Sequence, residues 1–263
     1  MKFYNRTTKI TVGVFIAIVA AVTVTAQATA IAQQPSEYLD SKNWTPIVAL
    51  DFNILPNPGG IVNTADGLRL DGYFPQIDTN HPAKNAEYTL NSKLSQNFEN
   101  KLVDFTVVFD GEFADKDNTV SFLAFGMRAN NPNYLIWGQP AYAVYFSENT
   151  FILHKFGKGQ QYEFDPTDFV IPYSRFPALG FNSFPKQKEI KITYGVVNEG
   201  AFPRIILKIN DVQVLNKLDN KNGPTIKNNP NNVFAIALVG TNKRVAGDET
   251  SHSNLLIKSI DVK

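Results

Sequence analysis

The sequence predicts an all-β fold of about a dozen short antiparallel strands, arranged as a sandwich or a barrel. Apolar residues recur at every second position over 103–109, 190–196 and 205–209, the period of a strand that buries one face. Turn-forming residues separate such segments, and only 92–100 has a helical pattern, a weak one. Short strands joined by hairpins, with almost no helix, are typical of this fold class.

The individual strands follow from the turns between them. Hairpin turns are predicted at Asp117-Asn118, Glu148-Asn149 and Asn210-Asp211, because Asn and Asp tolerate positive φ. In the last strand, Leu255 and Ile257 share one parity while Ile260 and Val262 share the other, which predicts a β-bulge near Lys258-Ser259. The remaining strands are expected at 47–53, 68–74, 120–128, 142–146, 150–156, 213–216 and 233–239.

The first 32 residues have the pattern of a secretory signal peptide. A basic start is followed by an uncharged apolar stretch over 10–24 and by the small-residue pattern Ala30-Ile31-Ala32. A membrane anchor is the alternative, but a spanning helix needs about 20 apolar residues and this stretch is shorter. We therefore expect cleavage after Ala32 and a protein secreted to the periplasm or the medium, with no membrane insertion afterwards.

Charge and cysteine content exclude several classes of partner and linkage. Removing Lys2, Arg6 and Lys9 with the signal peptide lowers the formal net charge from +1 to −2. A nearly neutral chain has no basic surface for nucleic acid or for anionic membranes. Because the chain has no cysteine, it has no disulfide framework, and its core alone must stabilise it outside the cell.

One domain is expected after the signal peptide. Residues 33–46 form a polar lead-in segment, and 47–263 are expected to form a single β-sandwich domain. Two long connections, 130–140 and 157–185, interrupt the strands, and connections of this length are often functional. The second is rich in phenylalanine and is expected to fold as a flap over a sheet.

Seven strand-like segments come in an order that resembles a known superfamily: 49–53, 66–72, 103–113, 141–157, 188–197, 204–214 and 255–262. The chain resembles the concanavalin A-like lectin and glucanase superfamily, in its laminin-G-like and keto-disaccharide-hydrolase-like branches. The resemblance implies a jelly-roll sandwich of two antiparallel sheets with an oligosaccharide or polysaccharide as ligand. It implies no particular activity, because the superfamily includes enzymes, lectins and adhesion modules.

The 128–145 stretch has the side chains that sugar recognition needs. Trp and Tyr rings stack on the apolar face of a pyranose, while Arg and amide groups bond to its hydroxyls. Burial of these aromatic rings in the sandwich end is the alternative. The predicted binding residues are Arg128, Tyr134, Trp137, Tyr142 and Tyr145, lining one sheet or its rim.

Catalytic chemistry has weaker support in the sequence. Glycoside hydrolysis needs two carboxylates about 5–9.5 Å apart, and Asp110 with Glu112 is the nearest pair, though solvated acids at a strand end are the simpler interpretation. His154 shares an apolar strand face with Ile152 and Phe156, as a partly buried histidine or as a base in a cleft. No catalytic residue is assigned.

No metal or cofactor is predicted either. The three histidines lack the spacing of a zinc site. A structural calcium ion is the alternative, at Asp51 with Asp261 or at Asp110, Asp115 and Asp117, but each group supplies too few of the six to eight oxygens that calcium needs for the ion to be assigned. Three functions remain open: a non-catalytic carbohydrate-binding domain, which the sequence favours, a glycoside hydrolase or polysaccharide lyase, and a surface or matrix protein-interaction module.

Overall fold

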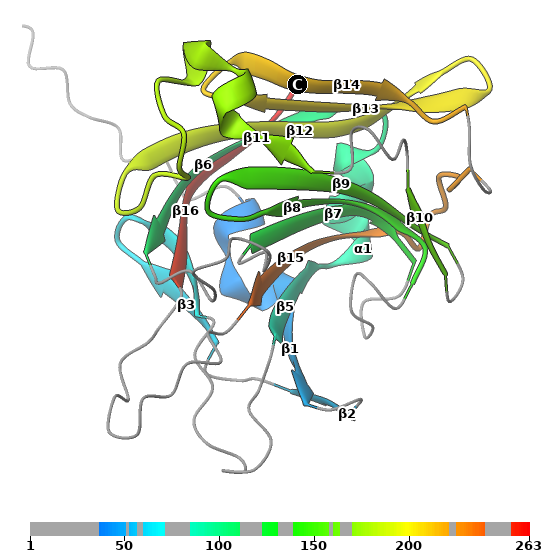
Figure 1. The fold of residues 1–263 in the computed structure, drawn as a ribbon. Coiled ribbons are helices and arrows are strands. Elements are labelled where there is room, and N and C mark those ends of the chain that lie inside the picture. Colours follow the sequence, from blue (N-terminus) through cyan, green and yellow to red (C-terminus); the bar gives the residue numbers. More distant parts are fainter. Residues whose placement is uncertain are drawn as a thin grey trace, which may run out of the picture. The chain divides into compact units, whose positions relative to one another are not determined.

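The computed structural model describes residues 37–50, 53–56, 60–71, 85–110, 123–130, 139–157, 160–163, 170–220, 225–239 and 254–263. These residues form two antiparallel sheets, as the sequence predicts, and Figure 1 shows β12, β13 and β14 stacked over β7, β8 and β9. The predicted signal peptide lies outside the described residues. Within them, no helix has the length and hydrophobicity needed to span a membrane.

Sheet A has eight strands in a continuous path and one short strand at its side. β11 (Ile171–Pro172) pairs with β9 beside that path. In spatial order the path is β10 (Gln160–Glu163), β9 (Thr150–Gly157), β8 (Ala141–Phe146), β7 (Leu123–Ala129), β15 (Val233–Val239), β5 (Asn85–Leu90), β1 (Trp44–Leu50) and β2 (Asn53–Pro56).

Sheet B has seven strands. Their order is β14 (Val212–Leu218), β13 (Phe202–Ile209), β12 (Glu189–Glu199), β6 (Leu102–Asp110), β16 (Asn254–Val262), β4 (Gly67–Asp71) and β3 (Ile61–Thr64). The helical segments are short: α1 (Ser92–Ser95) and the 3-10 turns η1 (Glu37–Leu39), η2 (Ser41–Asn43), η3 (Gln96–Phe98), η5 (Tyr173–Arg175) and η6 (Pro177–Leu179). The helical pattern predicted over 92–100 is thus confirmed as α1 and η3.

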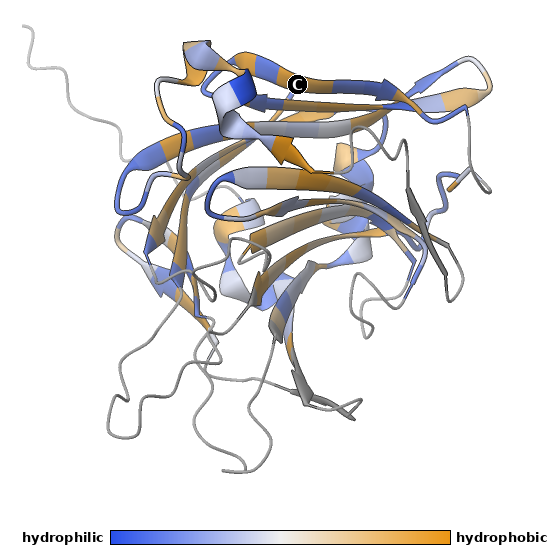
Figure 2. Ribbon diagram, viewed as in Figure 1, coloured by the Kyte–Doolittle hydropathy of each residue, from blue (hydrophilic) through white to orange (hydrophobic). Residues whose placement is uncertain are grey.

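The core lies between the two sheets, where the inward residues of each strand meet. Hydrophobic and hydrophilic residues are interleaved along the strands (Figure 2), as period-two burial requires. Phe105 of sheet B packs against Phe234 and Phe125 of sheet A, with ring centroids 5.0 and 5.1 Å apart. All three rings are buried. Burial of aromatic rings from both sheets stabilises the stack of one sheet on the other.

Two local features of the sequence are confirmed. The register between β16 and β6 shifts between Ile257 and Ser259, so an extra residue keeps Ile257 and Ile260 buried on the same side. Asn210 and Asp211 have φ angles of 47° and 64°, as a tight hairpin between β13 and β14 requires.

The described part of the phenylalanine-rich connection, 170–185, packs on the edge of the core. The ring centroids of Tyr173 and Phe151 are 5.9 Å apart, and those of Phe184 and Phe146 are 5.6 Å apart. Because Phe184 also meets Phe109 of sheet B, this segment contacts both sheets. The expected flap is therefore a packed edge of the sandwich in this part.

Two boundaries differ from those expected. Residues 44–46, assigned to the lead-in, are the start of β1, where Trp44 is buried and its indole N–H donates to the carbonyl of Tyr38. The strand expected at 47–53 is divided between β1 and β2. Burial of Trp44 against Phe234 of the core explains why the fold begins earlier than the polar composition suggests.

Candidate functional site

The outer face of sheet A, which points away from sheet B, is floored by small side chains. We call five of them the alanine floor: Ala124, Ala141, Ala143, Ala235 and Ala237. They come from three adjacent strands, β8, β7 and β15, and all are buried. A face that served only to pack against other apolar groups would normally carry larger aliphatic residues.

Three rings lie on one side of the alanine floor. We call Tyr145, His154 and Phe156 the aromatic trio. The Tyr145 and His154 rings meet edge to face with centroids 5.2 Å apart, and the His154 and Phe156 rings are stacked at 5.5 Å. Tyr145 is partly exposed, while the other two are buried. The trio arises because β8 and β9 are paired and their outward residues alternate with core residues.

Glu87 and Thr89 lie on the other side of the alanine floor. Both are on β5 and both are completely buried, and the Thr89 hydroxyl donates to the carbonyl of Thr45 at 3.3 Å. β5 pairs Glu87 with Ala237 and Thr89 with Ala235, so these polar residues point the same way as the floor. Burying a carboxylate costs free energy, so its presence on this face marks the face as a candidate site.

The pairing register of the strands places the aromatic trio and the polar residues of β5 at opposite ends of the same rows of side chains. Tyr145 is opposite Ala124, Ala124 is opposite Ala237, and Ala237 is opposite Glu87. These four residues form a row across β8, β7, β15 and β5 in which two methyl groups separate a phenol from a carboxylate. Long side chains at the ends of such a row can lean toward each other over the small residues between them.

Burial sets the protonation of the ionisable groups on this face. It raises the pKa of Tyr145 far above its ordinary value, and the negative charge of Glu87 adds to the rise, so the phenol remains protonated. The Tyr145 hydroxyl has no hydrogen-bond partner in the described part of the chain. Burial also lowers the pKa of His154 to about 4, which keeps its imidazole neutral at pH 7.

Together these groups have the chemistry that recognises a polyhydroxylated ligand, and all of them except Tyr145 are buried. The aromatic trio offers apolar ring surface, the Tyr145 hydroxyl offers a proton donor, and Glu87 and Thr89 contribute oxygen atoms. Glu87 is the only carboxylate among the described side chains that point outward from sheet A. The described side chains of this face therefore form no pair of carboxylates of the kind that glycoside hydrolysis uses.

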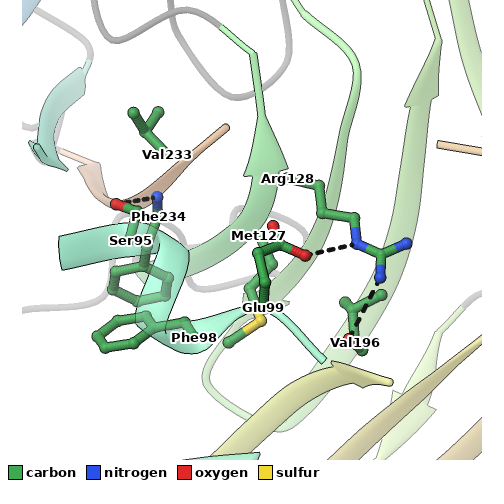
Figure 3. A pocket seen from close by; sticks show the side chains of 8 residues that line it. All are labelled: Ser95, Phe98, Glu99, Met127, Arg128, Val196, Val233 and Phe234. Carbon is green, nitrogen blue, oxygen red and sulfur yellow. Dashed lines mark hydrogen bonds and ion pairs between the residues drawn. The ribbon is translucent and has the colours of Figure 1, made fainter. Parts of the chain in front are cut away.

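Arg128, one of the predicted binding residues, has its guanidinium enclosed by protein. It donates to Glu99 at 3.2 Å, to the Ile226 carbonyl at 2.9 Å and to Asn198 at 2.8 Å. Figure 3 shows Arg128 reaching from β7 past Glu99 to the carbonyl of Val196 on β12. Its side chain is only 1% exposed. Arg128 thus joins the two sheets at one end of the sandwich.

The pocket beside Arg128 is too small for a sugar. It has space for about one water molecule. Burial raises the pKa of Glu99 there, against the opposing effect of the Arg128 charge. Its lining residues, drawn in Figure 3, are Ser95, Phe98, Glu99, Met127, Arg128, Val196, Val233 and Phe234.

Tyr142 points into the core, away from Tyr145. The two are three positions apart on β8, so strand alternation places them on opposite faces of sheet A. The Tyr142 hydroxyl donates to Asp219 at 2.5 Å and accepts from the backbone N–H of Ile226 at 3.1 Å. The expectation that Tyr142 and Tyr145 line one surface is therefore corrected by the structure.

The five predicted residues are thus not brought together. Tyr145 is on the outer face of sheet A, Arg128 and Tyr142 are bonded within the sandwich, and Tyr134 and Trp137 lie outside the described residues. Sequence analysis missed Glu87 and Thr89. The alternation of Ala86, Tyr88 and Leu90 with these two residues was the signal that could have revealed them.

The other candidate chemistry finds little support among the described residues. Asp110 is exposed at the end of β6 and accepts a hydrogen bond from Gln187. Glu112, Asp51, Asp115 and Asp117 lie outside the described ranges. Those ranges contain no group of three His, Asp or Glu residues that could hold a metal ion.

Large apolar side chains are exposed at separate places in the described chain. They are Val62 on β3, Val170 before β11 and Phe202 at the start of β13. Among the described residues, these three exposed side chains belong to three different elements.

Comparison with solved structures finds similar folds at low sequence identity. An alginate lyase from Pseudomonas aeruginosa matches with a TM-score of 0.46 and 11% identity, over 85% of this chain and 99% of that one. A beta-1,3-glucanase from Mycobacterium marinum matches with a TM-score of 0.46 and 10% identity, over 85% and 92%. Sheep galectin-11 matches with a TM-score of 0.38 and 5% identity, over 67% and 96%.

All three matches have TM-scores below 0.5 and identities of 11% or less, so no family or role is assigned to this chain from them. No family model matches the chain, and no curated protein sequence matches it.

Proposed function

We propose that this protein is a secreted, non-catalytic carbohydrate-binding domain that holds its ligand on the outer face of sheet A. The observation that carries the proposal is the combination of the aromatic trio, the alanine floor and buried polar residues on one face. Apolar packing alone does not account for Glu87, Thr89 and the unpartnered Tyr145 hydroxyl on that face.

The chemistry of sugars fits this arrangement. A pyranose ring has an apolar face that stacks on aromatic rings, and hydroxyls that both donate and accept hydrogen bonds. The Tyr145 hydroxyl can donate to a sugar oxygen without giving up a bond within the described protein. Glu87 and Thr89 provide acceptors about three strand spacings away, a distance of roughly 14 Å between backbones.

The test is a glycan array and a polysaccharide pull-down with the secreted protein and its Tyr145→Ala variant. The proposal expects binding to at least one glycan, and a loss of at least about tenfold in affinity for Tyr145→Ala with unchanged circular dichroism. Absence of binding to every glycan and polysaccharide tested would overturn it. If Tyr145→Ala binds the glycan with the same affinity as the wild-type protein, the binding site is not on the outer face of sheet A.

An enzyme of the same fold is the second candidate, and the His154–Tyr145 pair favours it. The ring centroids of His154 and Tyr145 are 5.2 Å apart. The neutral imidazole of His154 can serve as the base of an elimination, and the protonated phenol of Tyr145 can serve as the acid. The arginine that such a set would use is not on this face in the described residues, because Arg128 is bonded to Glu99 and Asn198. Absorbance from an unsaturated product, or release of reducing sugar, would establish this activity in place of simple binding.

A further inference from the structure

A lysine and an aspartate are held in contact inside the sandwich. The Nζ atom of Lys155, on β9, is 2.7 Å from Oδ1 of Asp219, and each side chain is only 1% exposed. By comparison, the lysine side chain in the pair between Lys191 and Asp104 is 34% exposed. Burying an ion pair this completely has a desolvation cost, so the pair calls for a physical reason beyond stability.

The backbone fixes the positions of both partners. Lys155 is paired with Tyr142 of β8 on one side and with Tyr162 of β10 on the other. Asp219 directly follows β14, and its backbone N–H donates to the carbonyl of Pro203 at 2.8 Å. The fold therefore holds an amine next to a carboxyl group, and such positioning can accelerate a reaction between two groups by many orders of magnitude.

Tyr142 contacts the other oxygen atom of the same carboxyl group. Its hydroxyl donates to Oδ2 of Asp219 at 2.5 Å, whereas Lys155 contacts Oδ1. The backbone N–H of Ile226 donates to the Tyr142 hydroxyl oxygen at 3.1 Å and holds it in place. A proton donor therefore lies on the oxygen atom that would have to leave if the lysine amine attacked the carboxyl carbon.

We propose that Lys155 and Asp219 form an intramolecular amide bond once the protein has folded, which links β9 of sheet A covalently to the end of β14 of sheet B. The lysine Nζ attacks Cγ of the aspartate, so the Nζ–Cγ bond forms and the Cγ–Oδ2 bond breaks. Of the three ammonium protons, one stays on the amide nitrogen and two leave with the departing oxygen as water. The Tyr142 hydroxyl donates a proton to that oxygen and is reprotonated from the ammonium group, so the reaction needs no further reactant.

The buried position favours the amide over the ion pair. The reaction replaces two buried charges by one neutral group, which removes the cost of desolvating them. With 1% exposure of each side chain, little water can return to hydrolyse the product. Lys155 and Asp219 are 64 positions apart, so the link restricts the unfolded chain as a disulfide does, in a chain that has no cysteine. The inference does not depend on the proposed glycan binding.

The experiment is mass spectrometry of the purified protein after denaturation. With the amide bond, the intact protein is lighter by one water molecule than the sequence from its determined N-terminus. Trypsin fails to cut after Lys155 because the amine is acylated, so the digest contains residues 129–158 joined to 218–221. Lys155→Arg keeps the positive charge and removes the amine. Lys258→Arg is the matched control, because it makes the same change at the exposed pair with Glu189.

The proposal expects the linked peptide in the wild-type protein and in Lys258→Arg, and its absence in Lys155→Arg. A wild-type protein of full mass that trypsin cuts after Lys155 would overturn it. A loss of water without the linked peptide would overturn it too, because Asp219 followed by Asn220 can lose water as a cyclic imide. If Lys155→Arg does not fold, the wild-type digest still decides between these results.

Tyr142→Phe tests the part of the proposal that concerns the proton donor. The linked peptide should form at least about tenfold more slowly in this variant, because the departing oxygen loses its donor. Formation at the wild-type rate would overturn the role of Tyr142 and leave the amide bond itself standing.

Discussion

Lys155 and Asp219 form an ion pair inside the sandwich, with Nζ 2.7 Å from Oδ1 and each side chain 1% exposed. Asp219 also accepts from the Tyr142 hydroxyl, which in turn accepts from the backbone N–H of Ile226. Arg128 donates to the carbonyl of Ile226. Three neighbouring strands of sheet A thus each provide one buried polar side chain that binds Asp219 or Ile226.

Breaking this ion pair should destabilise the protein strongly. Lys155→Met leaves the Asp219 charge buried without its main partner, and we expect a loss of about 3–5 kcal/mol in the free energy of unfolding. Lys258→Met breaks the exposed pair with Glu189 and should cost less than about 1 kcal/mol. Urea unfolding measures both, and similar values for the two variants would contradict the structural role of the buried pair.

Substitution of Arg128 should affect stability and leave glycan affinity unchanged. Arg128→Lys keeps the positive charge but loses the planar group that reaches Glu99, Asn198 and Ile226 together. We expect a loss of about 2–4 kcal/mol in unfolding free energy, with unchanged affinity for the glycan identified on the array. A large loss of glycan affinity in a correctly folded Arg128→Lys variant would contradict this and show that Arg128 takes part in binding.

Two tyrosine hydroxyls on opposite faces of sheet A should give opposite results. Tyr145→Phe removes a buried hydroxyl without a partner in the described chain, so stability should stay equal or rise by up to about 1 kcal/mol. Glycan affinity should fall about tenfold, because the ligand loses a donor. Tyr173→Phe removes a hydroxyl that donates to the carbonyl of Ser147, so stability should fall by about 1 kcal/mol with affinity unchanged.

His154 should make stability fall between neutral and mildly acidic pH. Burial lowers its folded pKa to about 4, whereas an unfolded histidine titrates near about 6.5. The unfolded state therefore binds more protons between these values, and lowering the pH from about 7.5 to about 5 should cost about 2 kcal/mol. Below about pH 4 both states are protonated, so this contribution ceases to change.

The measurement is urea unfolding of wild-type protein and His154→Gln at both pH values. The variant lacks the titrating group and should lose correspondingly less stability on acidification, which separates His154 from the carboxylates. An identical pH dependence in the two proteins would show that His154 is not buried as a neutral imidazole.

The sequence was sufficient to predict features that depend on neighbours in the chain. Inside-outside alternation predicted the long strands, and a parity change predicted the β-bulge beside Ser259. The turn at Asn210 and Asp211 followed from residues that tolerate positive φ. β5 was missed, because its outward residues, Glu87 and Thr89, are polar and its segment is short.

The site was harder to predict because it depends on contacts between distant strands. Arg128 and Glu99 are 29 positions apart, and Tyr142 and Asp219 are 77 apart, so no local pattern reveals that their polar groups are already bonded. The spacing of Tyr142 and Tyr145 did contain the information that they face opposite ways. Glu87 and Tyr145 lie in one row of the same face only through the register of four strands.

Mapping the bound ligand by NMR tests the central proposal most directly. The backbone amides of isotopically labelled protein are followed during titration with soluble laminarin oligosaccharides, or with another neutral glycan chosen from the array. We predict that the largest shift changes occur on β5, β7, β8, β9 and β15, around Glu87, Ala143, Tyr145 and His154. Shift changes confined to the outer face of sheet B, or none at saturating ligand, would contradict the proposal.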